Sequence, residues 1–415
     1  MLKHAGVFSS YADIWLLHGQ RTPFVDYNGA LAAVSPTDLG IHAARATLAS
    51  AGIPAGDVGH VFAGNMAQAS FDAYMLPRHI ALYAGTDLTT PATLTQRVCG
   101  TGIELLLQAA DRITLGQIAL GLCVGAESMS RNPIAAYGHR GGFRLGQVEF
   151  KDFLWEALFD PAANVSMGDT AEKLARQYGI PREQVDRFAE ASFHRALAAR
   201  EAGFFDGELC AIDNCMFELA GYQPRRLKLA AGHGRVTTDS HLRPSPYAEL
   251  ARIRPAFGGV QTAGNSSAIV DGAAAALVAS GDYRQQHHCA PLARIVAGAV
   301  IGVPPEIMGI GPAPAIRRLL QGSGLSLADI DRFEINEAFG AQCLAVMQEL
   351  GLDHQRVNVN GGAIAIGHPL AASGLRLSIT LARELQRCNG RFGIASACIG
   401  GGQGIALLLE NPACG

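Results

Sequence analysis

Four stretches of the sequence carry residues that suit nucleophilic or acid–base chemistry. The first leads into a helical pattern and reads Leu94-Thr95-Gln96-Arg97-Val98-Cys99-Gly100-Thr101-Gly102. A cysteine at a helix N-terminus sits among free backbone N–H groups at the positive end of the helix dipole, and both favour the nucleophilic thiolate. We expect Gly100 and Gly102 to leave room for a bulky group near the sulfur. The alternative is a cysteine that only packs in the core.

The second stretch holds a histidine and reads Asn358-Val359-Asn360-Gly361-Gly362-Ala363-Ile364-Ala365-Ile366-Gly367-His368-Pro369. Pro369 biases His368 away from helical backbone, and the glycines predict a tight, exposed turn. A histidine fixed there can act as a base near neutral pH. A purely structural histidine is the competing interpretation.

The third stretch, Asn336-Glu337-Ala338-Phe339, follows the apolar segment 333–335. Adjacent side chains on a strand point to opposite faces, so at most one of Asn336 and Glu337 faces a given pocket. An asparagine that positions a water or an oxyanion fits this pattern, and so does a turn-forming residue.

The fourth stretch combines a second cysteine with a glycine triplet and reads Ile394-Ala395-Ser396-Ala397-Cys398-Ile399-Gly400-Gly401-Gly402-Gln403-Gly404. Glycines after a strand let several backbone N–H groups converge, as an oxyanion hole or an anion-binding nest requires. The spacing is not that of a dinucleotide-binding loop. Cys398 would place a second thiol at the same site.

Apolar segments that alternate with helical patterns must position these stretches, and this alternation is typical of α/β proteins. The predicted strands are 14–17, 58–63 and 118–124, and the predicted helices are 37–51 and 103–115. From residue 129 to about residue 261 the chain is more polar, with one long amphipathic helix at 182–201. After Gly264 the apolar rhythm returns.

The last third of the chain echoes the first at an offset of 272 residues. The matches are Ala51-Gly52-Ile53 with Ser323-Gly324-Leu325, Asp57-Val58 with Asp329-Ile330, and Gly102 with Gly374. We predict two similar halves that face each other, with an inserted segment of about 130 residues. Ligand sites in open α/β sheets lie beyond the strand ends, where the loops around Cys99 and His368 would converge.

Composition limits the classes of function. A chain of 415 residues, 49% hydrophobic and 17% charged, exceeds what one core usually supports. The net charge of −3 without a long basic run argues against nucleic-acid binding. Nine irregularly spaced cysteines predict neither a disulfide framework nor paired metal-binding motifs. The N-terminal segment lacks the features of a signal peptide, and no stretch is apolar enough to span a bilayer. We expect a cytoplasmic protein.

Together these stretches resemble the thiolase family (acetyl-CoA C-acetyltransferases and 3-ketoacyl-CoA thiolases), and the resemblance covers nearly the whole chain. The blocks stand in family order as Arg21-Thr22-Pro23-Phe24, Cys99-Gly100-Thr101-Gly102, Glu127-Ser128-Met129-Ser130, Met167-Gly168-Asp169-Thr170-Ala171-Glu172, Thr262-Ala263-Gly264-Asn265-Ser266-Ser267, Asp271-Gly272-Ala273-Ala274, Asn336-Glu337-Ala338-Phe339, Gly367-His368-Pro369 and Cys398-Ile399-Gly400-Gly401-Gly402-Gln403-Gly404.

The resemblance implies an α/β thiolase-like fold, in which two similar βαβαβαββ halves form a layered αβαβα core with an inserted loop domain. The expected parts are an N-terminal half (1–128 and 268–291), a coenzyme A-binding loop domain (129–267) and a C-terminal half (292–415). Homodimers or homotetramers are expected.

The implied activity is reversible Claisen condensation and thiolytic cleavage of 3-ketoacyl-CoA, by an acetyl-CoA C-acetyltransferase or acyltransferase. Cys99 would be the acylated nucleophile, His368 the base that activates it, and Cys398 the second acid/base. Asn336 would hold a water that stabilises the thioester oxyanion together with His368 Nε2. The backbone N–H groups of Cys99 and Gly400 would form the other oxyanion hole. A thiol suits acyl transfer because it is both nucleophile and leaving group.

Coenzyme A and acyl-CoA are expected as substrates, with no permanently bound cofactor, no metal and no membrane partner. By the same resemblance, the pantetheine channel would be lined by Leu158, Met167, Ala263, Gly264, Ser267, Ala338 and Phe339. Arg243 would meet a phosphate.

Three positions depart from the family pattern. Gln96 stands where many members have Asn, and Ala371 replaces a glycine after the Gly-His-Pro motif. Ser166 stands near the acyl pocket where many short-chain thiolases carry His, so chain-length specificity and the direction used by the cell stay open.

Three other functions would explain part of this pattern. A decarboxylating condensing enzyme of the same superfamily pairs its cysteine with His/His or His/Asn, whereas Cys398 marks a thiolase. A non-catalytic acyl-CoA-binding protein would not need all four catalytic positions. A metal-dependent enzyme would rest on His287-His288-Cys289, which is better interpreted as a solvated loop.

Overall fold

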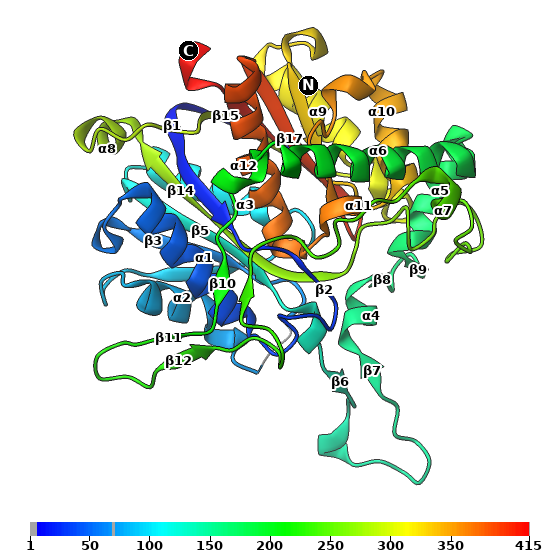
Figure 1. Cartoon of the computed structure of the whole chain (residues 1–415), viewed down its shortest axis with the longest axis horizontal. Coiled ribbons are helices and arrows are strands. Elements are labelled where there is room, and N and C mark those ends of the chain that lie inside the picture. Colours follow the sequence, from blue (N-terminus) through cyan, green and yellow to red (C-terminus); the bar gives the residue numbers. More distant parts are fainter. Residues whose placement is uncertain (1–5, 69–70, 415) are drawn as a thin grey trace.

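The computed structural model describes residues 6–68 and 71–414 (Figure 1). Residues 1–5 and 415, at the outer ends of the two expected halves, lie outside the described residues. The N-terminal strands are β1 (Val7–Arg21), β2 (Val25–Asp26), β3 (His60–Gly64), β4 (Ala92–Thr95), β5 (Leu120–Glu127) and β14 (Val270–Ser280). The C-terminal strands are β15 (Ala293–Gly302), β16 (Arg332–Ile335), β17 (Phe392–Ile399) and β18 (Gln403–Glu410).

Within the described residues these ten strands form one mixed sheet. Its order is β16-β17-β18-β15-β1-β14-β5-β3-β4, with β2 paired to β14. Strands β3, β4 and β5 run parallel, as do β16 and β17. The two halves of the sheet join where β1 pairs antiparallel with β15, and the register of that pair shifts between Ser10 and Ile14.

Six helices accompany these strands in two sets of three. They are α1 (Pro36–Ala51), α2 (Leu76–Ala84) and α3 (Thr101–Thr114), and then α9 (Pro312–Ser323), α10 (Gly340–Leu350) and α12 (Leu370–Cys388). The order is therefore β1-α1-β3-α2-β4-α3-β5-β14, followed by β15-α9-β16-α10-α12-β17-β18. In the second half a single bridge from Phe333 to Val357 stands where β4 stands in the first.

The internal repeat seen in the sequence is a repeat of structure. Strand β17 begins and ends 272 residues after β5. Helices α1 and α9 end at Gly52 and Gly324, which are 272 residues apart and adopt left-handed backbone with φ of 64° and 69°. Glycine has no Cβ to oppose this conformation, so it ends both helices in the same way. The predicted pair of similar α/β halves is confirmed.

The two halves meet along α3 and α12, which lie between the two parts of the sheet (Figure 1). A Cβ on Gly102 would lie 2.8 Å from the Cα of Gly374, so the two helix backbones touch at equivalent glycines. Helices α1 and α2 pack beside the N-terminal strands, and α9 packs on β15 and β18. This arrangement gives the layered αβαβα core.

The chain between β5 and β14 contributes no strand to the main sheet, within the residues described. Its strands pair with one another as β6 (Ile134–Ala135) with β7 (Lys151–Asp152), β8 (Phe159–Asp160) with β9 (Val165–Ser166), β10 (Ile212–Asp213) with β13 (Arg235–Val236), and β11 (Cys215–Phe217) with β12 (Arg225–Leu227). Its helices are α4 (Phe153–Ala157), α5 (Met167–Tyr178), α6 (Arg182–Glu201) and α7 (Tyr247–Leu250). The expected boundaries of this segment, 129–267, stay a prediction.

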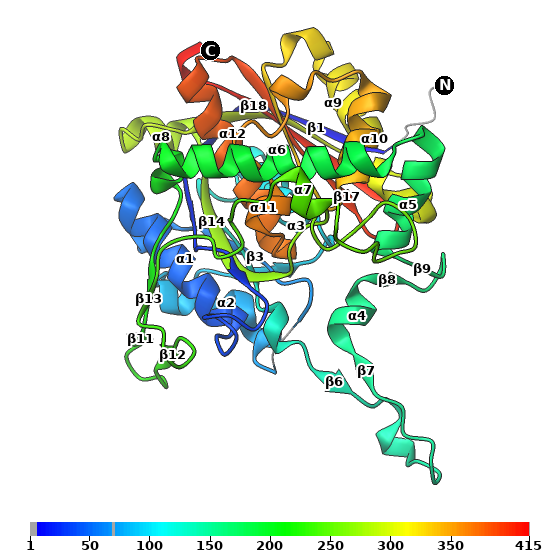
Figure 2. The same ribbon diagram turned by 45° about the vertical axis from the view of Figure 1, so that its right-hand side comes forward.

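Two features of this segment shape the molecule. Helix α6, predicted at the same residues, crosses in front of α11 (Ala363–Ile366) and α12 (Figure 2). The β6–β7 hairpin projects from the body as an arm (Figures 1 and 2). A short helix, α8 (Gly281–Gln286), follows β14. In the described part of the chain, no helix has the length and apolar character needed to cross a membrane.

Candidate active site

Cys99 lies just before α3, in a loop that Val98 bends with a positive φ of 43°. Thr101 holds this loop, because its Oγ1 donates to the carbonyl of Val98 at 2.7 Å and accepts the N–H of Arg97 at 2.8 Å. The backbone N–H groups of Gly400 and of Cys99 itself lie close to the Cys99 sulfur and lower its pKa. These are the two donors that were expected to form an oxyanion hole.

Burial determines the resting state of Cys99. The residue is only 7% exposed. Burial raises the pKa of its thiol to about 11 despite the two N–H donors, and the nearby Glu127 carboxylate raises this pKa further. The two N–H groups favour the thiolate, as expected, but burial outweighs them. Cys99 is a thiol at neutral pH and needs a base.

The glycines beside Cys99 serve packing. A Cβ on Gly100 would lie 2.6 Å from Ile399 Cδ1, and one on Gly102 would lie 2.5 Å from the backbone nitrogen of Leu375. The expectation that these glycines open space for an acyl group is wrong. Their missing side chains let β17 and α12 approach α3 closely.

His368 is buried, with 5% of its surface exposed, and α6 and α12 pack around the segment that carries it. A Cβ on Gly361 would lie 2.5 Å from the Ala196 side chain of α6. The predicted exposed turn is thus wrong, because the inserted segment covers it. Burial, and after it the charge of Arg376, lowers the pKa of His368 to about 3, so the imidazole is neutral.

The hydrogen bonds of His368 assign its tautomer. The hydroxyl of Ser373 donates to the carbonyl of Pro369 at 3.0 Å, and its oxygen lies 2.5 Å from His368 Nδ1. The hydroxyl hydrogen is thus in use, so Nδ1 carries a proton and donates to Ser373. The other nitrogen, Nε2, is unprotonated, and its lone pair accepts from Asn336 Nδ2 at 3.2 Å. Nε2 is the basic atom.

Asn336 and Glu337 point to opposite sides, as the strand geometry predicts. The carboxylate of Glu337 accepts from Ser192 Oγ at 2.7 Å and from Asn358 Nδ2 at 2.9 Å, away from His368. The Oδ1 of Asn336 is buried and has no partner among residues 6–68 and 71–414. Asn336 is the member of the pair that faces the site.

Cys398 is buried at the end of β17, opposite Gly404 of β18. Burial and then the neighbouring Cys99 thiol raise the pKa of Cys398 far above its usual range. Gly401 and Gly402 follow with φ of 83° and 86°, conformations that glycine adopts without strain. The turn they form directs the Gly400 N–H at the Cys99 sulfur.

A cavity of about 500 Å³ opens beside these groups, and His368 lines it. Cys99 packs against Met129 and Leu370, and Cys398 packs in a cluster with Met167 and Phe339. These four apolar residues also line the cavity. His368 therefore lines the cavity directly, and each thiol packs behind apolar residues that line it.

Five of the eight residues expected to bind coenzyme A line this cavity, namely Leu158, Met167, Ala263, Ser267 and Phe339. Gly264, Ala338 and Arg243 are not among its lining residues in the described chain.

Those three residues lie nearby. Gly264 is buried against Ile253, and the carbonyl of Ala338 accepts the N–H of Ser267 at 3.0 Å. Arg243 is exposed and donates to the carbonyl of His241, a lining residue, at 3.0 Å.

Two family models match the chain over nearly its whole length. The model for the thiolase N-terminal domain matches residues 14–282, and the model for the thiolase C-terminal domain matches residues 289–411. The chain belongs to the thiolase family. The predicted family, fold and enzyme class, an acyltransferase, are thereby confirmed.

Curated relatives of this thiolase include both branches named by the resemblance. It is 42% identical over 404 residues to a mitochondrial 3-ketoacyl-CoA thiolase from Bos taurus, covering 96% of this chain and 98% of the relative. It is 41% identical over 403 residues to an acetyl-CoA acetyltransferase from Pseudomonas aeruginosa, covering 96% and 99%. The crystal structure of human mitochondrial 3-ketoacyl-CoA thiolase in complex with CoA superposes with a TM-score of 0.90 at 39% identity, covering 97% of this chain and 100% of that one.

Sequence reasoning missed the role of Glu127 in this thiolase. This buried carboxylate at the end of β5 accepts four N–H groups, from the Asn65 side chain (3.0 Å), Met66 (2.7 Å), Ala67 (3.3 Å) and Ala371 (3.1 Å). Burial raises the pKa of Glu127 to about 7. The carboxylate ties the residues after β3 and the first turn of α12 to the end of β5, next to Cys99. Its place in the block Glu127-Ser128-Met129-Ser130 was the available signal.

Other lining residues of the cavity carried no motif in the sequence. Trp155 and Phe257 add aromatic walls, and Asp26 lies 2.7 Å from His241 at the same cavity. They come from β2, α4 and loops of the inserted segment. Only the fold brings them together.

The departures from the thiolase pattern have structural explanations. Ser166 caps α5, because its Oγ accepts the N–H of Asp169 at 3.2 Å and donates to the Asp169 carboxylate at 2.7 Å. It also lines the cavity. Ala371 packs toward Gly64, where an added Cβ would lie 3.4 Å from its own. Gln96 Oε1 accepts the N–H of Val98 at 3.3 Å, within the Cys99 loop.

Proposed function

We propose that this thiolase cleaves and forms 3-ketoacyl-CoA through an acyl-enzyme on Cys99. The observation that carries the proposal is the pair of backbone donors, from Gly400 and Cys99, on a sulfur beside the cavity that His368 lines. Donors placed there would stabilise an oxyanion on the carbon that the sulfur attacks. The names of the relatives, 3-ketoacyl-CoA thiolase and acetyl-CoA acetyltransferase, agree with this chemistry.

In the first step of cleavage, His368 Nε2 takes the proton of Cys99, and the sulfur attacks the 3-keto carbon. The keto oxygen becomes an oxyanion held by the N–H groups of Gly400 and Cys99. The bond between C2 and C3 then breaks, which leaves the acyl group on Cys99 and an acetyl-CoA enolate. Protonated His368 and Asn336 would stabilise the enolate oxygen, and the Cys398 thiol would give the proton to C2.

In the second step, Cys398 would take the proton of an incoming coenzyme A thiol. The coenzyme A sulfur attacks the acyl-enzyme, and the carbonyl oxygen again sits between the two backbone donors. Collapse of this intermediate releases acyl-CoA and restores the Cys99 thiol through His368. Condensation runs the same steps in reverse.

We also propose that the preferred acyl chains are longer than that of acetoacetyl-CoA. Ser166 leaves open the space that a histidine side chain would fill, and its hydroxyl is engaged by Asp169. The walls around it are largely apolar, with Trp155, Leu158 and Phe257 among the lining residues. Apolar walls favour each added methylene by about 0.8 kcal/mol when it is fully buried.

The test is kcat/KM for 3-ketoacyl-CoAs with acyl chains of four to twelve carbons. We expect kcat/KM to rise from acetoacetyl-CoA to longer substrates. Ser166→His should restore preference for acetoacetyl-CoA, whereas Ser166→Ala, which loses the same helix cap without filling space, should keep the wild-type order. A wild-type maximum at acetoacetyl-CoA would refute the chain-length proposal, and no turnover of any substrate would refute thiolase function.

The coenzyme A moiety is proposed to enter along the inserted segment. Leu158, Met167, Ala263, Ser267 and Phe339 would contact pantetheine, and Gly264 and Ala338 would support that wall from behind. Arg243, beside His241, would meet a phosphate at the outer end. Arg243→Gln should raise KM for coenzyme A and leave kcat within twofold.

A homo-oligomer is proposed from the arm, which exposes large apolar side chains. They are Ile134, Tyr137, Phe143, Leu145, Val148 and Phe150. Exposed apolar surface of this kind usually marks an interaction site, and most soluble oligomers are symmetric copies of one chain. Light scattering after size exclusion should give a dimer or tetramer mass, and Tyr137→Ser with Phe150→Ser should lower it.

The cytoplasm stays the proposed location. All nine cysteines, each in the described part of the chain, are free thiols, which suits a reducing compartment. Several relatives are named mitochondrial, so fractionation of the native cell is the direct test.

A further inference from the structure

Arg376 is a fully buried cation on α12 that does not line the cavity in the described chain. Its Nη1 lies 3.2 Å from Glu334 Oε2. Its Nε and Nη2 are buried and have no hydrogen-bond partner among residues 6–68 and 71–414. A buried guanidinium with one protein partner is costly to fold, and the mechanism so far does not use it.

The pair joins the two elements that hold the nitrogens of His368. Strand β16 pairs with β17, and the N–H of Asn336, which donates to the carbonyl of Ser396, continues this pairing by one residue. Glu334 and Asn336 are two residues apart on this extended strand, so their side chains point to the same face of the sheet. Ser373 and Arg376 are three residues apart on α12 and share a helix face.

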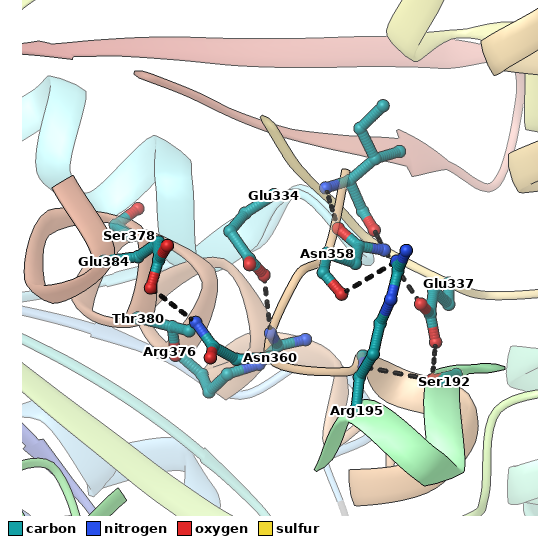
Figure 3. A network of polar contacts seen from close by, with 12 residues as sticks. Ser192, Arg195, Glu334, Glu337, Asn358, Asn360, Arg376, Ser378, Thr380 and Glu384 are labelled. Atoms are coloured by element: carbon teal, nitrogen blue, oxygen red, sulfur yellow. Dashed lines mark hydrogen bonds and ion pairs between the residues drawn. The ribbon is translucent and has the colours of Figure 1, made fainter. Parts of the chain in front are cut away.

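Asn336 and Ser373 contact the two nitrogens of His368, and the Glu334–Arg376 ion pair joins the same two elements next to these contacts. Figure 3 shows Glu334 and Arg376 facing each other across the gap between β16 and α12. Farther along in the same view, Glu337, Asn358 and Ser192 anchor the chain that follows Asn336. The strand end is thus fixed from both sides.

We propose that Arg376 is a positioning residue for His368. With Glu334 it fixes the spacing between α12 and the end of β16, and its partly balanced charge keeps the imidazole unprotonated. The inference rests on the proposed role of His368 as the base. Asn336 and Ser373 can hold opposite nitrogens of one ring only while that spacing is kept.

The charged groups around His368 are consistent with a role of Arg376 in keeping its imidazole neutral. The titratable and charged groups on the elements around His368 are Arg376 on α12, Glu334 on β16, Glu337 after it, Glu127 on β5, Asp271 on β14, Arg195 on α6, Cys99 before α3 and Cys398 on β17. Arg376 is the one among them that lowers the pKa of His368, after burial. Burial raises the pKa of Glu334, and the charge of its partner Arg376 acts in the opposite direction, so the ion pair balances the Arg376 charge only in part.

The experiment is the pH profile of kcat/KM for thiolysis, from pH 3 to 9, in the full-length enzyme, because the His368 pKa of about 3 places the wild-type acid limb below pH 5. Arg376→Met should lower kcat by about tenfold or more and move the acid limb to higher pH, because the pKa of His368 rises when the cation is lost. Arg376→Lys keeps the charge and should keep the wild-type acid limb. Glu334→Gln should lower kcat without moving that limb upward.

Two controls separate the possible failures. Arg387→Met removes a charge near the far end of the same helix and should leave the profile unchanged. His368→Asn should lose turnover; if it kept wild-type kcat, the proposed base would be wrong. If His368→Asn is inactive and Arg376→Met keeps the wild-type acid limb, only the inference about Arg376 is overturned. Should Arg376→Met fail to fold, judged by circular dichroism, the neutral pair Glu334→Gln/Arg376→Met replaces it with the same expected shift.

Discussion

The backbone N–H of Gly400 lies against the sulfur of Cys99 and lowers its pKa, so a residue of the C-terminal half acts on the proposed nucleophile of the N-terminal half. In the resting enzyme the Gly400 N–H interacts with the Cys99 sulfur. In the proposed reaction it would serve an oxyanion on the attacked carbon, where negative charge develops next to the same sulfur. The contact is therefore in place before substrate arrives.

Removing His368 should expose the intrinsic acidity of Cys99. In His368→Asn, the rate of alkylation by iodoacetamide should rise about tenfold per pH unit between pH 7 and 10, because a pKa of about 11 makes thiolate scarce until alkaline pH. Mass spectrometry of the Cys99 peptide against time gives the rate. A plateau already reached at pH 8 would contradict the raised pKa.

Cys398→Ala should separate the two half-reactions. Acyl transfer from labelled acetyl-CoA to Cys99 should continue, while carbon–carbon bond exchange should fall by at least about a hundredfold, since no group remains to move the C2 proton. Cys123→Ala is the matched control, because Cys123 is also a fully buried thiol but lies on β5, where it donates to the carbonyl of Leu105. Failure to trap any labelled acyl-enzyme in Cys398→Ala would contradict the division of roles.

Glu127→Gln should loosen the loops around Cys99. A glutamine turns an acceptor into a donor against N–H groups that need acceptors, which costs about 1–3 kcal/mol when buried. Urea unfolding should show this loss of stability, and kcat should fall together with it. The exposed Glu183→Gln serves as the control. Unchanged stability in Glu127→Gln would show that the carboxylate is already protonated and only weakly bonded.

Arg21→Met should weaken the link between the core and the inserted segment. Arg21 is buried and lies 2.7 Å from Glu208 and 2.6 Å from Asp239, so its loss strands two buried carboxylates at a cost of about 3–5 kcal/mol. Arg187→Gln, which breaks an exposed pair with Glu183, should cost less than about 0.5 kcal/mol. Thermal unfolding compares the two. Equal losses of stability in the two variants would contradict this structural role of Arg21.

Much of the fold could be predicted from local sequence signals. Helix α6 spans the predicted residues, and the predicted helix at 37–51 ends at Gly52 as expected. These signals are local, because helical periodicity and a left-handed glycine act within a few residues. The 272-residue offset predicted two similar halves, because glycines such as Gly52 and Gly324 recur at equivalent helix ends in both halves.

The sequence could not predict what depends on burial. Cys99 and His368 were identified as candidates from their neighbours along the chain, yet their pKa values depend on helices and loops distant in sequence. The turn that carries His368 was expected to be exposed, but the inserted segment covers it and buries it. Gly102 was read as space for substrate, because nothing local reveals that Gly374 would meet it across the molecule.

The raised pKa of both buried thiols also affects how this enzyme meets peroxide. Oxidation to sulfenic acid proceeds through the thiolate, and at rest both Cys99 and Cys398 hold their protons. An enzyme with two sulfurs at one cavity would otherwise be an easy target for oxidative damage. Because the Cys99 thiol loses its proton only when His368 accepts it, these sulfurs are reactive mainly during turnover.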